Sequence, residues 1–135
     1  KMKEAKTEAE IILLLKDTDK DVRKAAIKAL GSLGSKESVP HLRALLKDAE
    51  QETAIRAIAA EALGELGELA KEAVADLIEI SLKKKGDEVG ERNEAMFALA
   101  KIGDRQVLPA LRRVMMDKES KTRLVAAGAI WRLTK

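Results

Sequence analysis

The chain has 135 residues, 46% of them hydrophobic, which is enough to bury a sizeable core. It contains no cysteine, which excludes disulfides, thiol catalysis and thiolate metal sites. Its 26 basic and 23 acidic residues are interspersed and give a formal net charge of +3, which indicates a solvated surface rather than a nucleic-acid-binding one. Because it shows neither a membrane-spanning apolar run nor a signal peptide, we expect a cytoplasmic protein with no membrane partner.

The apolar residues recur at the three- and four-residue spacing of amphipathic helices. With one Phe, one Trp and no Tyr, the core must consist of small and aliphatic side chains, which suits closely packed helices. The pattern predicts an all-α fold with helices at about residues 4–16, 20–33, 37–47, 51–66, 70–84, 88–102, 106–117 and 120–134. We expect the helix at 70–84 to be lengthened and the turn at 83–87 to be irregular.

Four copies of one pattern follow each other along the chain. In each copy the second helix carries an arginine near its start and small residues after it. The arginines are separated by 33, 36 and 31 residues, a spacing typical of repeat arrays: Arg23, Arg56, Arg92 and Arg123. We therefore expect one domain over residues 1–135, with repeats at about 4–34, 35–67, 68–103 and 104–135.

Turn residues stand where the helix ends require them. Gly34, Gly67 and Gly103 follow second helices, where a residue in the left-handed conformation closes the helix. Pro40 and Pro109 stand near the starts of first helices, where a missing N–H costs least. The expected N-cap residues are Asp19, Ser35 and Asp104.

Alanines align between the second helices and predict close stacking of the repeats. One aligned set is Ala26, Ala59, Ala95 and Ala126, and the other set is Ala29, Ala62, Ala98 and Ala129. Gly31, Gly64 and Ala100 align with Trp131, where a small residue is expected at a joint with a following repeat. Trp131 therefore either caps the last core or anchors a partner or a second copy through the open end of the array.

These segments resemble HEAT repeats, specifically the short bacterial and archaeal type first noted in phycobilin lyases. The matching segments are Leu-Leu-Lys-Asp at 14–17 and 45–48, Asp-Val-Arg-Lys-Ala-Ala at 21–26, and Ala-Leu-Gly-x-Leu-Gly at 29–34 and 62–67. Glu91 and Thr122 depart from the aliphatic residue that usually precedes the arginine. The resemblance implies an α-α superhelix (solenoid) of four HEAT-like hairpins, with second helices lining a concave face that binds other macromolecules. It implies no shared chemistry.

The recurring arginines have two interpretations. They form either a ladder for anions or a set of structural contacts with the aspartates between helices, Asp17, Asp48 and Asp117. We favour the structural role, because arginine and aspartate both recur with the scaffold.

The chain shows no motif that predicts catalysis, a cofactor or a metal. His41 is the single histidine, and we expect a capping or surface role for it. Residues 83–85 are consecutive lysines that favour a helix C-terminus, with phosphate binding as the alternative. No phosphate loop, metalloprotease motif or nucleophile elbow is present, so we predict a non-enzyme.

The variable positions of the second helices are the candidate contact surface. Two sets of aligned positions change along the chain from charged to apolar residues. The first set is Lys24, Ala57, Asn93 and Leu124, and the second set is Lys28, Glu61, Phe97 and Gly128. Phe97 and Leu124, with Met96 beside them, either form an exposed patch for a partner or are buried by the fourth repeat.

We therefore predict a protein-binding or scaffolding module. Its candidate contacts are Lys24, Lys28, Glu61, Asn93, Phe97, Leu124 and Trp131. The partner is expected to be another protein, and the chain a monomer or a weak homodimer through its C-terminal repeat. The alternatives are nucleic-acid binding, which Glu61 and the scarcity of aromatic residues disfavour, and an accessory role for a bilin lyase, which rests on the resemblance.

Overall fold

A computed structural model describes residues 2–83 and 89–135 of the chain. Within these ranges the chain forms α-helices and 3-10 turns, with no strand. The α-helices are α1 (Met2–Leu14), α2 (Lys20–Leu33), α3 (Val39–Lys47), α4 (Thr53–Leu66), α5 (Val74–Ser81), α6 (Val89–Ile102), α7 (Leu108–Val114) and α8 (Ser120–Thr134). The 3-10 helices η1 (Lys36–Ser38), η2 (Gly67–Ala73) and η4 (Arg105–Val107) precede α3, α5 and α7.

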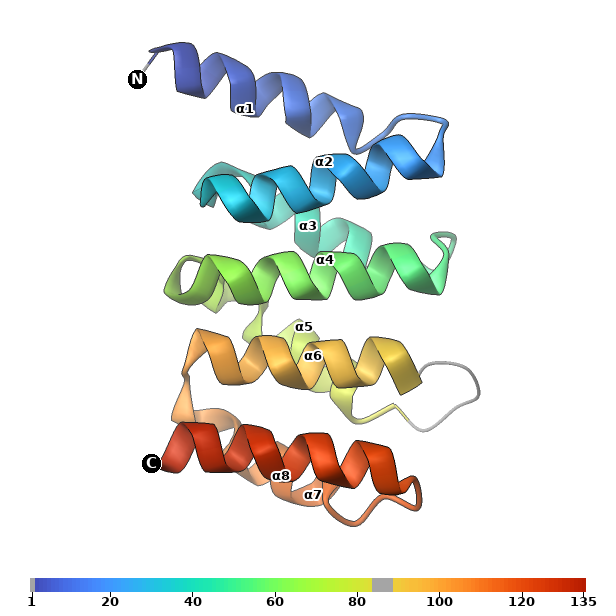
Figure 1. Cartoon of the computed structure of the whole chain (residues 1–135), viewed down its shortest axis with the longest axis vertical. Coiled ribbons are helices and arrows are strands. Elements are labelled where there is room, and N and C mark those ends of the chain that lie inside the picture. Colours follow the sequence, from blue (N-terminus) through green and yellow to red (C-terminus); the bar gives the residue numbers. More distant parts are fainter. Residues whose placement is uncertain (1, 84–88) are drawn as a thin grey trace.

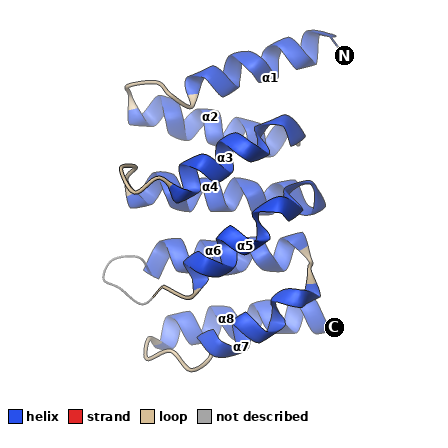
Figure 2. Cartoon of the chain, turned by 180° about the vertical axis from the view of Figure 1, so that it is seen from behind, coloured by secondary structure: helices blue, strands red, loops and turns tan. Residues whose placement is uncertain are grey.

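The helices stack as antiparallel hairpins in two layers (Figure 1). The second helices α2, α4, α6 and α8 lie one below another, and α3, α5 and α7 lie behind them, as the reverse view shows (Figure 2). Each second helix packs on the next one, whereas the first helices touch each other at only a few positions. The array is therefore a helical solenoid, as predicted. We call the exposed side of α2, α4, α6 and α8 the second-helix face.

The core runs continuously through the stack. Leu30, Leu63 and Leu99 occupy equivalent positions in three repeats and are fully buried. A Cβ added at Gly31 would lie 3.1 Å from the Cβ of Ala62, and one added at Gly64 would lie 2.9 Å from the Cα of Ala98. The prediction of small residues at these joints is confirmed, because no side chain fits at Gly64 without moving the neighbouring backbone.

Most helix ends follow the sequence signals. The φ angles of Gly34, Gly67 and Gly103 are 69°, 59° and 81°, in the region that favours glycine. The Asp19 carboxylate accepts the N–H of Asp21 at 2.8 Å, and Asp104 caps η4 in the same way. Ser35 does stand at the N-cap position of η1, but the expected side-chain cap is absent. Its hydroxyl instead donates to Glu8 Oε2 at 3.2 Å.

The helix expected at 70–84 is shorter than predicted. The 3-10 helix η2 occupies residues 67–73, Ala70 breaks the helical conformation at φ −99° and ψ 20°, and α5 ends at Ser81. The same kind of 3-10 turn precedes α3 and α7, because the chain must change direction between one hairpin and the next. The predicted lysine run and irregular turn fall largely on residues 84–88, outside the described residues.

Candidate functional site

Three of the recurring arginines close the turns between the two helices of a hairpin. Their guanidinium groups donate to backbone carbonyl oxygens at the end of the first helix: Arg23 to Asp17 at 2.7 Å, Arg56 to Asp48 at 3.3 Å and Arg123 to Asp117 at 2.8 Å. The carboxylates of the same aspartates accept backbone N–H groups two residues further on. The aspartates named as structural partners thus contact these three arginines, and they do so through their carbonyl oxygens.

Two further contacts of the arginines cross the joints between repeats. Arg92 is buried, and its Nη2 lies 2.7 Å from Asp117 Oδ2 in the following repeat. Arg56 Nε lies 3.0 Å from Oε1 of Glu91, a fully buried residue at the position where an aliphatic residue was expected. Glu91 thus replaces an apolar contact by an ion pair between α4 and α6. All four arginines make contacts within the scaffold; Arg92 is buried, Arg23 and Arg56 are partly buried, and Arg123 is exposed.

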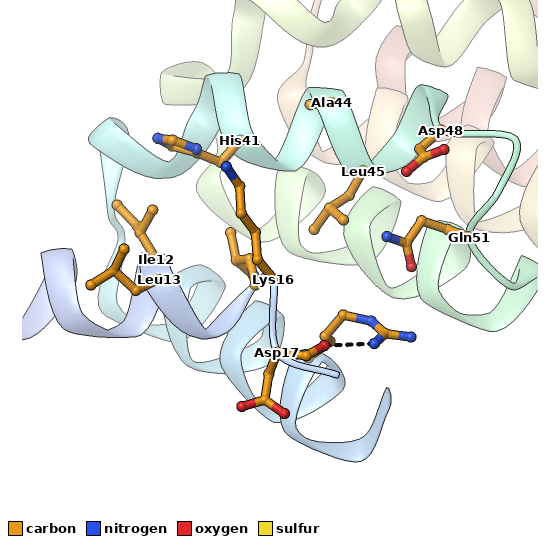
Figure 3. A pocket seen from close by; sticks show the side chains of 11 residues that line it. Ile12, Leu13, Lys16, Asp17, His41, Ala44, Leu45, Asp48 and Gln51 are labelled. Atoms are coloured by element: carbon orange, nitrogen blue, oxygen red, sulfur yellow. Dashed lines mark hydrogen bonds between the residues drawn. The ribbon is translucent and has the colours of Figure 1, made fainter. Parts of the chain in front are cut away.

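One hollow lies between α1 and α3, on the side of the first helices (Figure 3). It has a volume of about 450 Å³, with apolar walls that include Ile12 and Leu45 and with Lys16 and His41 at its edge. Its polar groups mostly belong to the turns just described, and the bond from Arg23 to Asp17 crosses it. It arises because α1 packs on α2 and η1 rather than along α3.

A second hollow, of about 520 Å³, lies between α6 and α8. We call it the C-terminal hollow. Its lining residues are Phe97, Ala100 and Lys101 from α6, and Gly128, Ala129, Trp131, Arg132 and Lys135 from α8 and the residue after it. Phe97 is 47% exposed and Trp131 is 63% exposed. The two aromatic residues of the chain therefore open onto one concave site.

Helical spacing explains this grouping. Trp131, Arg132 and Lys135 follow Gly128 by three, four and seven residues, so they share one side of α8. A Cβ added at Gly128 would meet no atom within 4 Å. Space remains beside Phe97 because the fourth repeat has a glycine where the first three repeats have Lys28, Glu61 and Phe97.

The candidate contact residues are not all brought together. Lys28 and Glu61 are exposed and Lys24 is partly buried, and none of them lines the C-terminal hollow. Leu124 is 72% exposed but does not line the hollow. Asn93 is buried, contrary to the expectation that it lines the groove, because it points into the packing at the start of α6.

Two further expectations are corrected. Met96 is fully buried, so it belongs to the core and not to a patch with Phe97. Trp131 is not a cap folded over the last core, because its ring is largely exposed and the Nζ of Lys135 lies 4.6 Å from the ring centroid. Of the two alternatives for Phe97 and Leu124, burial by the fourth repeat is wrong, because both side chains are exposed.

The electrostatics of the neighbouring surface are mixed. Burial raises the pKa of the Glu94 carboxyl above its ordinary value, the Glu61 carboxylate raises it further, and Lys101 lowers it. Negative charge therefore lies beside the C-terminal hollow, towards α4. Lys101, Arg132 and Lys135 make no ion pair within the described part of the chain.

Residues 2–83 and 89–135 contain no group of three or more histidine, cysteine or acidic residues placed to hold a metal ion. In the same ranges, no helix has the length and apolar character needed to cross a membrane.

The fold and its repeated turns define the chain as a helical-repeat protein. Residues 7–92 match the family model described as HEAT repeats, and residues 91–115 match the PBS lyase HEAT-like repeat. The chain belongs to the HEAT repeat family. A search of curated proteins found no match.

A similar solved structure is a chain from the complex of CpcE and CpcF of phycocyanin lyase from Nostoc sp. PCC7120. The two chains share 18% sequence identity, with a TM-score of 0.78 over 90% of this chain and 78% of that chain. At this level of identity the likeness is one of fold.

Proposed function

We propose that this chain is a non-catalytic protein-binding module, one domain of four repeats that takes its partner on the second-helix face. The observation that carries the proposal is the C-terminal hollow, where Phe97 and Trp131 are held open to solvent on a packed scaffold. Exposed aromatic side chains in a concave, partly apolar site are the usual anchors of a protein interface.

The construction of the site supports binding rather than catalysis. Phe97 and Trp131 project from helices whose inward sides are closely packed, with Ala98, Leu99 and Ala129 buried beneath them. The rings therefore lose little conformational freedom when a partner covers them. Among the described residues that line this hollow, none has a carboxyl or imidazole side chain as a candidate acid or base.

Replacing Phe97 tests the proposal. The Phe97→Ala variant should retain its helical circular dichroism, because the side chain is only half-buried, and should lose about tenfold in affinity for the partner. Proteins retained from a lysate of the source organism by immobilised wild-type and variant chains would be compared by mass spectrometry. The matched control is Met116→Ala, which removes a more exposed apolar side chain outside the hollow.

The outcomes separate clearly. A protein that is retained by the wild type and by Met116→Ala but lost with Phe97→Ala would support the proposal, once its direct binding to the purified chain is measured. The same proteins on all three chains would contradict it. Unfolding of Phe97→Ala would assign the side chain to the core.

A second candidate function is an accessory role in bilin attachment. It is favoured by the match to the PBS lyase HEAT-like repeat and by the likeness to a chain from a phycocyanin lyase complex. Co-expression with a bilin source and its acceptor protein tests it. Chromophore attachment that depends on this chain would favour this function, and attachment at the same rate without it would exclude it.

A further inference from the structure

We propose that the occupant of the C-terminal hollow is an acidic protein segment that inserts one apolar side chain between Phe97 and Trp131. This rests on the proposed function and specifies the chemistry of its partner. The hollow combines an apolar interior with a rim of positive charge, and the two properties together define the occupant.

The interior fits one side chain of a partner. Its lining combines the small residues Ala100, Gly128 and Ala129 with the two aromatic residues. A volume of about 520 Å³ lies within the range of pockets that bury most of a small ligand. An aromatic or large aliphatic side chain would remove apolar surface of both rings from water.

The rim selects for negative charge. Lys101, Arg132 and Lys135 line the hollow, and no acidic residue does. Lys135 already lies over the ring of Trp131, at 4.6 Å from its centroid, so one cation is held at the entrance. Carboxylates on either side of the inserted side chain would pair with Arg132 and Lys135, which make no salt bridge in the described part of the chain, and would compete with Glu94 for Lys101.

The charge pattern disfavours the other occupants. A nucleic acid strand needs a basic track that continues beyond one site, but Glu61 and Glu94 stand on the second-helix face between this hollow and Lys28. A two-fold contact between copies of the hollow would bring two sets of the cations Lys101, Arg132 and Lys135 into one interface, where like charges repel.

Trp131 provides a direct readout, because it is the single tryptophan of a chain without tyrosine. The probe is a short peptide in which aspartate and glutamate flank one phenylalanine, titrated against the full chain while tryptophan emission is followed. We expect a saturable change in emission that weakens as salt is added. A peptide with asparagine and glutamine in place of the acids should bind at least about fivefold more weakly.

Two pairs of variants locate the site. Gly128→Leu should abolish peptide binding because its side chain fills the hollow without touching packed atoms, whereas Gly90→Leu adds the same side chain to α6 outside the hollow and should leave binding unchanged. Arg132→Gln combined with Lys135→Gln should weaken binding by about fivefold, and Lys28→Gln, at the other end of the second-helix face, should not.

The proposal fails in distinguishable ways. Equal affinity for the acidic and neutral peptides would overturn the acidic partner while leaving the proposed function intact. No saturable change with the acidic peptide, or undiminished binding by Gly128→Leu, would also overturn it. Tighter binding of a single-stranded oligonucleotide would favour a nucleic acid, and a dimer lost in Gly128→Leu would favour a second copy. The proposed function itself fails only if Phe97→Ala retains the same proteins as the wild type.

Discussion

The joint between α4 and α6 differs from the joint between α6 and α8, although both connect second helices of neighbouring repeats. At the first joint, Gly64 lies so close to Ala98 that no Cβ fits, and a buried ion pair between Arg56 and Glu91 links the same two helices nearer their other ends. At the second joint, Gly128 faces open space and the C-terminal hollow lies between the helices. The scaffold is thus closely packed at the first joint and open at the second, where we propose that a partner binds.

The largest expected effect is at the closed joint. Arg56→Ala leaves the Glu91 carboxylate fully buried without its cation, which should lower the free energy of unfolding by about 3 kcal/mol or more. Urea unfolding followed by circular dichroism measures it. Lys20→Ala, which removes an exposed pair with Glu52 at 3.8 Å, should cost less than about 1 kcal/mol. Similar decreases in the free energy of unfolding of the two variants would show that the buried pair stabilises the chain no more than the exposed pair does.

A pair of glycine substitutions tests the comparison most directly. Gly64→Ala should lower the free energy of unfolding by about 1 kcal/mol, because a clash with the Ala98 backbone outweighs the gain in helix propensity. Gly128→Ala should raise it by up to about 1 kcal/mol, because the same gain comes without a clash. Thermal unfolding of both variants measures the difference. Equal changes of the same sign in the free energy of unfolding of Gly64→Ala and Gly128→Ala would show that the two glycines are packed alike.

The smallest effect concerns Glu94, on α6 between the two joints. Because folding raises the pKa of its carboxyl, the folded chain binds a proton more readily than the unfolded chain. The associated stability is present below the ordinary carboxyl pKa and is lost as the pH rises through the folded-state pKa. Glu94→Gln should therefore be more stable than the wild type at neutral pH, by at most about 0.5 kcal/mol because the group is mostly solvated.

A pH series of unfolding curves checks the sign of this effect. The advantage of Glu94→Gln should shrink as the pH falls and the wild-type carboxyl becomes protonated. The matched control is Glu79→Gln on α5, an exposed carboxyl on the other layer. A variant that is less stable than the wild type at neutral pH would show that Lys101 outweighs burial and Glu61.

The helices and their joints were predictable from local patterns. Apolar spacing located the helices, and glycines marked the ends of α2, α4 and α6 with positive φ angles. The need for small residues at Gly31 and Gly64 followed from their alignment between repeats. Each of these signals acts over a few residues or recurs at the repeat period, so it is visible in the sequence.

The candidate site was predictable only in part. Phe97 was identified, but adjacent residues on a helix point about 100° apart, and only the packed structure shows that Met96 points inward. Trp131 was assigned to the end of the array, yet it lines a hollow with Phe97. The aspartates that contact the arginines were identified, but only the turn geometry shows that Arg23 and Arg123 bind carbonyl oxygens whereas Arg92 binds a carboxylate.

Periodicity and helix-end residues were therefore sufficient to specify four repeated pairs of helices, and the resemblance of the repeated segments indicated their family. The tertiary structure alone decided that Phe97 and Trp131, 34 residues apart, share one hollow with Lys101, Arg132 and Lys135. The physical reason is that such a hollow depends on the rotation and separation of two neighbouring helices, and on the missing side chain at Gly128. Residues in either helix taken separately do not reveal that arrangement.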